Sequence, residues 1–237
     1  LDIAGLERAK LARRAENAFV GAPTGLMDQA AATLCTAGHA LFFDCRTDDA
    51  EQVRFDTVNA GLEILVLDTK TPHALVDSEY AARRASCEEA ARLLGVPALR
   101  DVTDADTALD KLPDPVIQRR VRHVITENAR VLEAVKVLRT GRIADLAPLL
   151  DASHSSMRDD FAITVPQVDL AVQTARTSGA LGARMTGGGF GGCIIAMVRA
   201  GEAERIGHEI ARSFATAGYG PPAHFTAVPS AGAQRVR

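Results

Sequence analysis

Apolar residues form short dense runs in some stretches of the chain and recur every three or four residues in others. The run LEILVL at residues 62–67 is rich in branched side chains and predicts a buried strand. Further strands are expected at residues 40–45, 52–55, 193–198 and 223–228, each next to a polar or glycine-containing turn.

Spacings of three and four predict helices over most of the remaining chain. The first helix covers residues 1–19, and a short one restarts at Leu26 with Thr24 as its expected N-cap. A long amphipathic helix is expected at residues 121–138. The expected inward positions are, helix by helix, Leu11, Ala15, Ala18 and Phe19; Tyr80, Cys87, Ala91 and Leu94; Val121, Val124, Asn128, Val131, Val135 and Leu138; Leu146, Leu149, Leu150 and Ser153; Val165, Val168, Val172 and Ala175; Ile206, Ile210 and Phe214.

The order of these elements indicates the fold class. From Gly61 onward the chain reads as a strand, several helices, a strand, a helix and a last strand. This order suits an antiparallel sheet backed by helices, so we predict an α+β fold.

Composition and charge narrow the functional classes. Hydrophobic residues make up 47% and charged residues 24% of the 237 positions, enough for a sizeable core. A net charge of −3 without a long basic run argues against nucleic acid or a membrane as a partner. The scattered cysteines, Cys35, Cys45, Cys87 and Cys193, favour reduced thiols in a cytoplasmic protein over a disulfide frame or a zinc site.

The stretch GARMTGGGFGGC, residues 182–193, contains six glycines. It is no Walker A loop, because no Gly-Lys-Ser/Thr follows, and it leads into a strand rather than the helix of a dinucleotide fingerprint. Two interpretations stay open. The stretch is either a glycine-rich hairpin without a ligand or an anion-binding concavity of successive backbone amides.

Two carboxylates, Glu16 and Asp28, flank the turn GAPTG at residues 21–25. A carboxylate beside a helix start is ordinarily a cap or a first-turn charge. Asp28 nevertheless stands among Leu26, Met27 and Ala30, and partial burial there would tune it as a base.

A third polar stretch, HSSMRDDF at residues 154–161, contains residue types that occur in catalytic sites. The adjacent Asp159 and Asp160 cannot face one target as a glycosidase pair does. A loop with a capping Asp and an ion pair from Arg158 is the favoured interpretation. His154 lies beside two serines, but no GxSxG elbow exists in the chain, so we exclude hydrolase chemistry.

Five motifs in one order carry a family resemblance: GxPxGxMDQ, GHALxxDCR, SEYxxRRxxCEEA, SHxSxRDD and RMTGGGFGGC. Together they resemble the galactokinases of the GHMP small-molecule kinase superfamily, over essentially all 237 residues. The resemblance implies a GHMP-kinase-like two-domain fold, with residues 1–58 as a remnant of the N-terminal domain and 59–237 as the C-terminal α+β domain. It also implies phosphorylation of the anomeric hydroxyl of α-D-galactose with ATP and Mg²⁺, by a cytoplasmic monomer.

The resemblance also implies roles for individual residues. Asp28 would be the catalytic carboxylate, taking the proton from the sugar hydroxyl or orienting it, with the backbone of Gly25 against the sugar. Tyr80 would contact a sugar hydroxyl, although without the family it would read as an ordinary half-buried helix residue. Glu16 would be a Mg²⁺ ligand, since that ion prefers oxygen donors. The glycines beside the nucleotide phosphates would be Gly187, Gly188 and Gly189.

Two further motifs of the family, RxxEHxDY for the sugar and PxxxGLSSSA for the ATP phosphates, do not occur in the sequence. The chain begins at Leu1 inside a helical pattern, so we expect a fragment of a longer protein that carries both motifs upstream. We therefore expect the 237 residues alone to bind ATP weakly and to have negligible kinase activity. Smaller departures are Thr24, where many members have Cys, and Phe161, where Tyr is common.

Two alternative functions stay open. One is a related kinase that acts on N-acetylgalactosamine or arabinose. The other is a galactokinase-like sensor that binds sugar and ATP without phosphorylation, and such a protein could keep both Asp28 and Glu16.

Overall fold

The structure is a computed structural model that describes residues 3–21, 24–71 and 76–234. Ala22 and Pro23 of the first motif lie outside the described residues. Among the helices in the described part, none is both long and apolar enough to cross a membrane.

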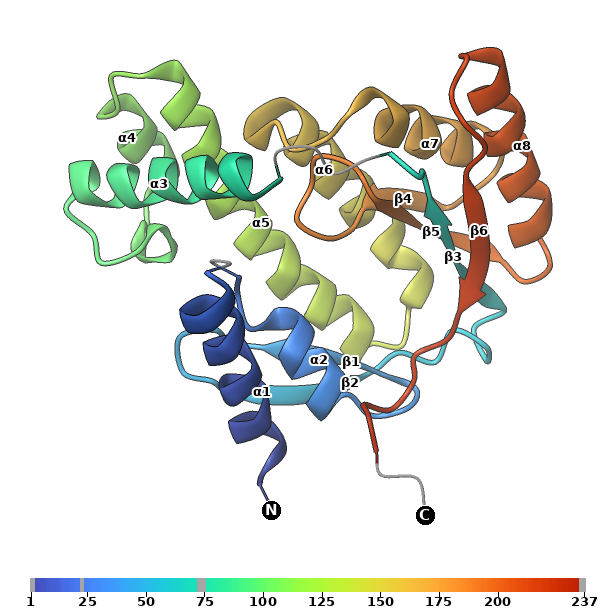
Figure 1. Ribbon diagram of the computed structural model, residues 1–237, viewed down its shortest axis with the longest axis horizontal. Coiled ribbons are helices and arrows are strands. Elements are labelled where there is room, and N and C mark those ends of the chain that lie inside the picture. Colours follow the sequence, from blue (N-terminus) through green and yellow to red (C-terminus); the bar gives the residue numbers. More distant parts are fainter. Residues whose placement is uncertain (1–2, 22–23, 72–75, 235–237) are drawn as a thin grey trace.

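Four strands form an antiparallel sheet in the order β4-β5-β3-β6. The central strands are β5 (Cys193–Arg199) and β3 (Leu62–Asp68), and the outer ones are β4 (Gly182–Met185) and β6 (Ala223–Ala227). The helices α7 (Pro166–Thr177) and α8 (Ala203–Thr216) cover one face of this sheet (Figure 1). The α+β class and the antiparallel sheet are confirmed, and β4 is a strand that the hydrophobic pattern did not predict.

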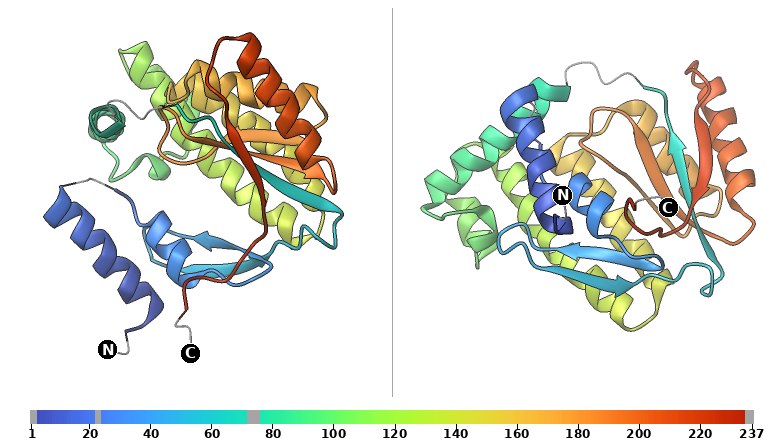
Figure 2. Two further views of the ribbon diagram at one scale, coloured as in Figure 1. Left: turned by 45° about the vertical axis from the view of Figure 1, so that its right-hand side comes forward. Right: turned by 60° about the horizontal axis from the view of Figure 1, so that its bottom comes forward.

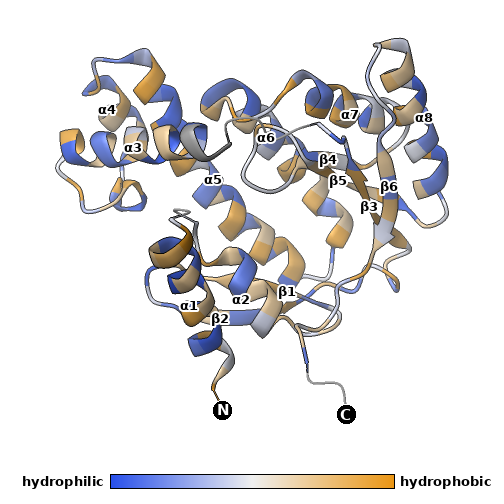
Figure 3. Cartoon of the chain, viewed as in Figure 1, coloured by the Kyte–Doolittle hydropathy of each residue, from blue (hydrophilic) through white to orange (hydrophobic). Residues whose placement is uncertain are grey.

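The packing of α8 follows its apolar period. Ile206, Ile210 and Phe214 have no exposed surface and pack against Leu65, Leu67 and the inner residues of β5. Figure 3 shows the hydrophobic residues along β5 and the hydrophilic residues on the outer side of α8. Burial of this face is what holds the helix on the sheet.

A helical region connects β3 to α7. It contains α3 (Val76–Leu94), η2 (Leu99–Asp101), α4 (Ala105–Asp110), α5 (Pro115–Arg139), η3 (Ile143–Leu146), α6 (Ala147–Ser156) and the π-helical turn η4 (Met157–Phe161). The first part of α5 packs on α3 through Val121, and its end packs on β2 and the second face of the sheet through Val135 and Leu138.

The middle of α5 differs from the expected continuous face. Asn128 is exposed and Val131 is 44% exposed, so the prediction is wrong at these two positions. The two ends of the helix bury their side chains in different cores, and the segment between them covers neither.

The beginning of the chain forms α1 (Gly5–Arg14), the π-helical stretch η1 (Ala15–Val20), α2 (Met27–Leu34) and the hairpin of β1 (His39–Phe43) and β2 (Ala50–Arg54). The last described residues return to this part, as Figure 1 shows. Gly232 N donates to Cys35 O (2.8 Å) and Ala233 N to Ala32 O (2.7 Å). The proposed division at residues 58/59 stays a prediction.

The expected inward face of the first helix is wrong. Leu11 is 47% and Phe19 93% exposed, while Ala9 is buried and packs with Leu6 near Leu34. From Ala15 onward, including Phe19, the wider π-helical turn of η1 interrupts the period of 3.6 residues on which the expectation depended.

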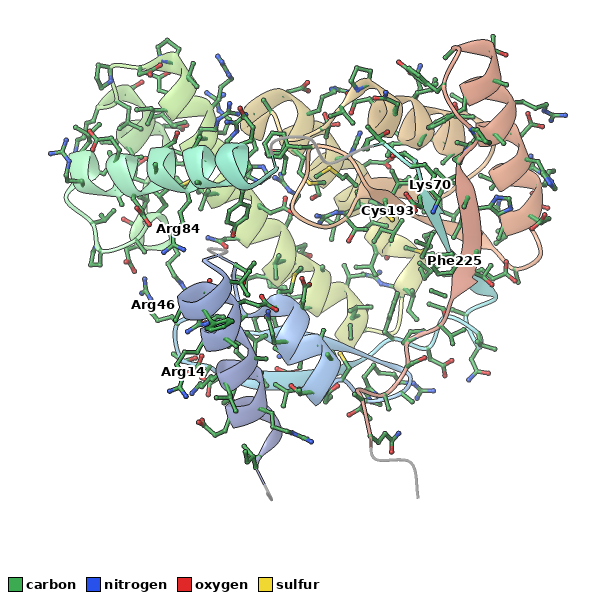
Figure 4. The ribbon with its side chains drawn as sticks, viewed as in Figure 1. Arg14, Arg46, Lys70, Arg84, Cys193 and Phe225 are labelled. Carbon is green, nitrogen blue, oxygen red and sulfur yellow. The ribbon has the colours of Figure 1, made fainter. Side chains whose placement is uncertain are left out.

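Two crossed ion pairs join this region to the helical region. Arg46, which follows β1 and is labelled in Figure 4, donates to both carboxylate oxygens of Asp101 (2.7 and 2.8 Å). Arg100 donates in the same way to Asp44 (2.7 and 2.8 Å). Bidentate pairs fix the orientation of both groups, so they set the position of the β1–β2 turn relative to η2.

Candidate functional site

Asp28 is the second residue of α2 and lies in its first turn, with its side chain exposed. The expected partial burial is therefore wrong, since only Leu26 and Ala30 among its neighbours are buried. A carboxylate at this place is stabilised by the free N–H groups of the helix start. Gly25 lies just ahead of it, and nothing stands within 4 Å of the place where a Cβ would be. Both groups face open space.

Thr24 is not the cap of α2, contrary to the expectation. The N-cap is Leu26, without a side-chain hydrogen bond, so Thr24 lies two residues too early to reach the first free amides. Its hydroxyl donates instead to Glu16 Oε2 (2.7 Å).

Glu16 is held beside the start of α2 by two donors. Its Oε2 accepts from Thr24 and from Gln29 Nε2, which is also at 2.7 Å. These two hydrogen bonds lower the pKa of Glu16 below its usual value, and the bond from Thr24 has the larger effect. Glu16 is therefore a carboxylate at neutral pH. Because Gln29 directly follows Asp28, the structure brings Glu16 and the α2 start together.

The oxygen atoms at this place suit a hard cation. Glu16 Oε1 makes no hydrogen bond within the described part of the chain, and the buried Oε1 of Gln29 also lacks a partner there. Mg²⁺ is typically bound by one or two carboxylates together with water and substrate phosphates. The described residues contain no group of three or more His, Cys, Asp or Glu that could hold a metal by themselves.

The glycine stretch forms the whole of β4, the first residue of β5 and the connecting loop from Thr186 to Gly192, which we call the glycine loop. Gly187 and Gly188 are exposed, and a Cβ at either would meet nothing within 4 Å. Gly187 has a φ of 90°, which a side chain would strain. The backbone here is open to a ligand, as the second interpretation of this stretch requires.

Gly189 is different, because it is buried against the segment after η4. A Cβ there would lie 2.7 Å from Ile163 O, and its φ is 93°. The next residue, Phe190, donates its N–H to the same carbonyl at 2.7 Å. Packing therefore explains this glycine, and its proposed place beside the nucleotide stays a prediction.

Tyr80 lies half-buried on α3, as the ordinary reading of a lone tyrosine predicted. Arg83, one turn later, connects this helix to the glycine loop. It donates to Phe161 O (2.9 Å) and Ala162 O (3.0 Å), and its guanidinium lies 5.4 Å from the centre of the Phe190 ring. Arg83 was not among the predicted site residues, although it is the first arginine of the motif SEYxxRR.

A half-buried charged cluster lies between α5, α6 and β4, and no sequence signal pointed to it. Glu127 accepts from Ser153 (2.5 Å), Arg130 (2.7 Å) and Arg184 (3.2 Å). Burial alone would raise the pKa of Glu127, but these hydrogen bonds and the charge of Arg184 lower it. Arg184 also donates to Met185 O (2.9 Å), so the cluster holds the strand that leads to the glycine loop.

Residues 154–161 are helical, at the end of α6 and in η4, so the expected loop with a capping Asp is wrong, while the expected ion pair is present. Arg158 and Asp159 form the expected ion pair at 2.7 Å. Asp160 accepts from Ser156 (3.0 Å), whose hydroxyl lies 3.0 Å from His123 Nδ1. Burial lowers the pKa of His123 to about 4, so this ring is neutral at pH 7.

The predicted site residues thus form two groups. Glu16, Gly25 and Asp28 gather at the start of α2. Tyr80 and the glycine loop are connected through Arg83. In the views of Figures 1 and 2 the glycine loop lies on the side of the sheet nearest α2.

The sequence and the fold are similar to those of known proteins. The family GHMP kinases C terminal matches residues 134–216. The galactokinase of Streptomyces coelicolor is 48% identical over 239 aligned residues, covering 100% of this chain and 62% of the relative. That of Mycobacterium tuberculosis is 48% identical over 219 residues, covering 92% and 60%. The chain therefore spans about 60% of the length of these curated relatives.

Among solved structures, that of Lactococcus lactis galactokinase complexed with galactose matches with a TM-score of 0.93 at 30% identity. The match covers 100% of this chain and 62% of that one. The agreement includes the region of α2 as well as the sheet, because the whole chain is aligned. The chain therefore carries a GHMP kinase C-terminal domain at residues 134–216, and over its whole length it is similar to galactokinases.

Proposed function

We propose that the protein containing this chain transfers the γ-phosphoryl group of ATP to the anomeric hydroxyl of α-D-galactose. The observation that carries the proposal is the gathering of Asp28, Glu16 and Gly25 at one helix start, in a chain that matches a galactose-bound galactokinase over its full length. Phosphoryl transfer requires mainly positioning and neutralisation of charge, and these residue types supply both.

In this proposal Asp28 orients the sugar hydroxyl or accepts its proton, and its exposed place at the α2 start leaves it accessible to the sugar. Glu16 would hold Mg²⁺ through its unengaged oxygen, and the ion would neutralise charge on the phosphates. Gly187 and Gly188 would let the phosphates approach the backbone, and Tyr80 would contact the sugar. The four free cysteines support the further proposal of a cytoplasmic location.

The test is ADP release on galactose by the longer protein, comparing wild type with Asp28→Asn. Asp106→Asn is the matched control, because Asp106 is also exposed in the first turn of a short helix, α4. We expect kcat to fall by about 10²- to 10⁴-fold for Asp28→Asn and to stay unchanged for Asp106→Asn. Near-full turnover of Asp28→Asn would remove the assigned role.

The same assay separates the alternatives. A kinase for N-acetylgalactosamine or arabinose would turn over that sugar faster than galactose, and a sensor would bind ATP and galactose without releasing ADP. We also propose that residues 1–237 assayed alone have negligible activity, because the sugar motif RxxEHxDY and the phosphate motif PxxxGLSSSA are absent from them. An ordinary kinase rate from this chain alone would contradict that.

A further inference from the structure

The strand β4 is an outer strand of the sheet and pairs only with β5. In an antiparallel edge strand, alternate N–H groups point away from the partner and need acceptors from elsewhere. The N–H groups of Ala183 and Met185 are such a pair. Ala183 N donates to Asp151 Oδ1 at 2.9 Å, and Met185 N donates to His154 Nδ1 at 3.3 Å.

Both acceptors come from one face of α6. Ala147, Asp151 and His154 are spaced by four and three residues, so they lie above one another along the helix. At the first of these positions the strand approaches closely, since a Cβ on Gly182 would lie 2.4 Å from Ala147 O. The helix therefore follows the free edge of β4 along its whole length.

Two charged residues of α7 face these acceptors. Arg176 Nε lies 2.9 Å from Asp151 Oδ2, and Asp169 Oδ1 lies 3.3 Å from His154 Nε2 without hydrogen-bond geometry. Because Nδ1 of His154 accepts from Met185, the neutral ring carries its proton on Nε2, toward the carboxylate. The ring is buried, with 3% of its surface exposed, so water cannot replace it as an acceptor.

We infer that Asp151 and His154 are positioning residues, which satisfy the free edge of β4 and so hold the glycine loop in place. The other side of the strand is held by Arg184 on Glu127, so the strand is fixed from both sides immediately before Thr186. The consequence for catalysis rests on the proposed function, whereas the structural part of the inference does not.

The structural part is tested by amide hydrogen exchange on the purified protein. His154→Leu removes the acceptor at similar volume, and His154→Asn keeps an oxygen near the place of Nδ1. We expect exchange at residues 183–187 to accelerate about five- to tenfold in the Leu variant and to return toward wild type in the Asn variant. Peptides from β3 and α8 should not change, and neither should any peptide in the control His208→Leu, whose side chain is 64% exposed.

If His154→Leu does not fold, Asp151→Ala gives the same test at Ala183, because Asp151 is only half-buried. Unchanged exchange at residues 183–187, or an equal acceleration throughout the sheet, would overturn the inference. In the longer protein we then expect the KM for ATP to rise more than kcat falls, with recovery in His154→Asn. A changed exchange rate without any change in KM would leave the edge role intact and refute only the connection to catalysis.

Discussion

The sheet layer and the region of α1 and α2 are built in opposite ways. Between the sheet and α7 and α8, large side chains such as Leu65 and Phe214 are completely buried. Around α1 and α2 the fully buried apolar residues are Ala9, Leu26 and Ala30, all but one of them small, while Phe19 and Val20 face solvent. The glycine loop therefore projects from a well-packed platform, whereas Asp28 and Glu16 lie on a weakly packed element.

This difference shows how each half of the site is positioned. The glycine loop is fixed by core packing, by Ile163 and by the charged cluster around Glu127. The α2 start is fixed mainly by hydrogen bonds between side chains, those of Thr24 and Gln29 to Glu16. Hydrogen bonds between half-exposed groups contribute less to stability than burial of large side chains.

The largest expected difference in stability comes from truncating one aromatic residue in each of the two regions. Phe214→Ala should lower the free energy of unfolding by about 3–5 kcal/mol, because it leaves a cavity under α8. Phe19→Ala should change it by less than about 0.5 kcal/mol, because that ring is 93% exposed. Denaturant titration of both variants measures this, and equal losses would contradict the comparison.

Between pH 6.5 and 4, the free energy of unfolding should depend on His123 of α5 and not on the region of α1 and α2. The pKa of His123 is about 4 in the folded protein against about 6.5 unfolded, because of burial. The unfolded state therefore binds the proton first, and stability present above pH 6.5 is lost as pH falls toward 4, on the order of 3 kcal/mol. His123→Gln should flatten this slope, and His208→Gln should not.

Glu16, on η1 beside the start of α2, should affect stability only at lower pH. The pKa of Glu16 is below its usual value of 4.5, so the stability that the carboxylate contributes is lost as the pH falls below 4.5 and through the lowered pKa. An equal slope between pH 6.5 and 4 in wild type and His123→Gln would assign the loss to other groups.

The smallest effect distinguishes two neighbouring glycines of the loop. Gly189→Ala should cost about 2 kcal/mol, because its φ is positive and Ile163 O blocks the Cβ. Gly188→Ala should leave stability unchanged, since nothing lies within 4 Å. Differential scanning calorimetry checks both. If Gly188→Ala also leaves the KM for ATP unchanged in the longer protein, the exposed glycines do not line the nucleotide site.

The parts of the fold that depend on local periodicity could be predicted. The spacing of Ile206, Ile210 and Phe214 indicates one buried face, and α8 buries it. The same reasoning fails at Phe19, where the π-helical stretch η1 after α1 changes the period, and in the middle of α5, where the helix passes between two cores. Neither cause is visible in the local pattern, because each depends on what the helix packs against.

The candidate site, too, could be predicted from the sequence only in part. The residues of the α2 start and the glycine loop could be proposed from motifs, because short-range spacing carries that signal. The residues that hold these groups in place could not be proposed in this way. Glu127 and Arg184 are 57 positions apart in the sequence, and His154 and Met185 are 31 positions apart. His154 looked like an isolated histidine beside two serines.

By itself the sequence determined the fold class, the strands β3, β5 and β6 of the four-stranded sheet, the buried face of α8 and the motifs that resemble galactokinases. Tertiary structure alone decided that β4 is an edge strand, that α6 satisfies its amides, and that Asp28 is exposed while Gly189 is buried. The reason is physical. Periodicity and turn chemistry act over a few residues, whereas burial and the pairing of polar groups are set by chain segments that meet only after folding.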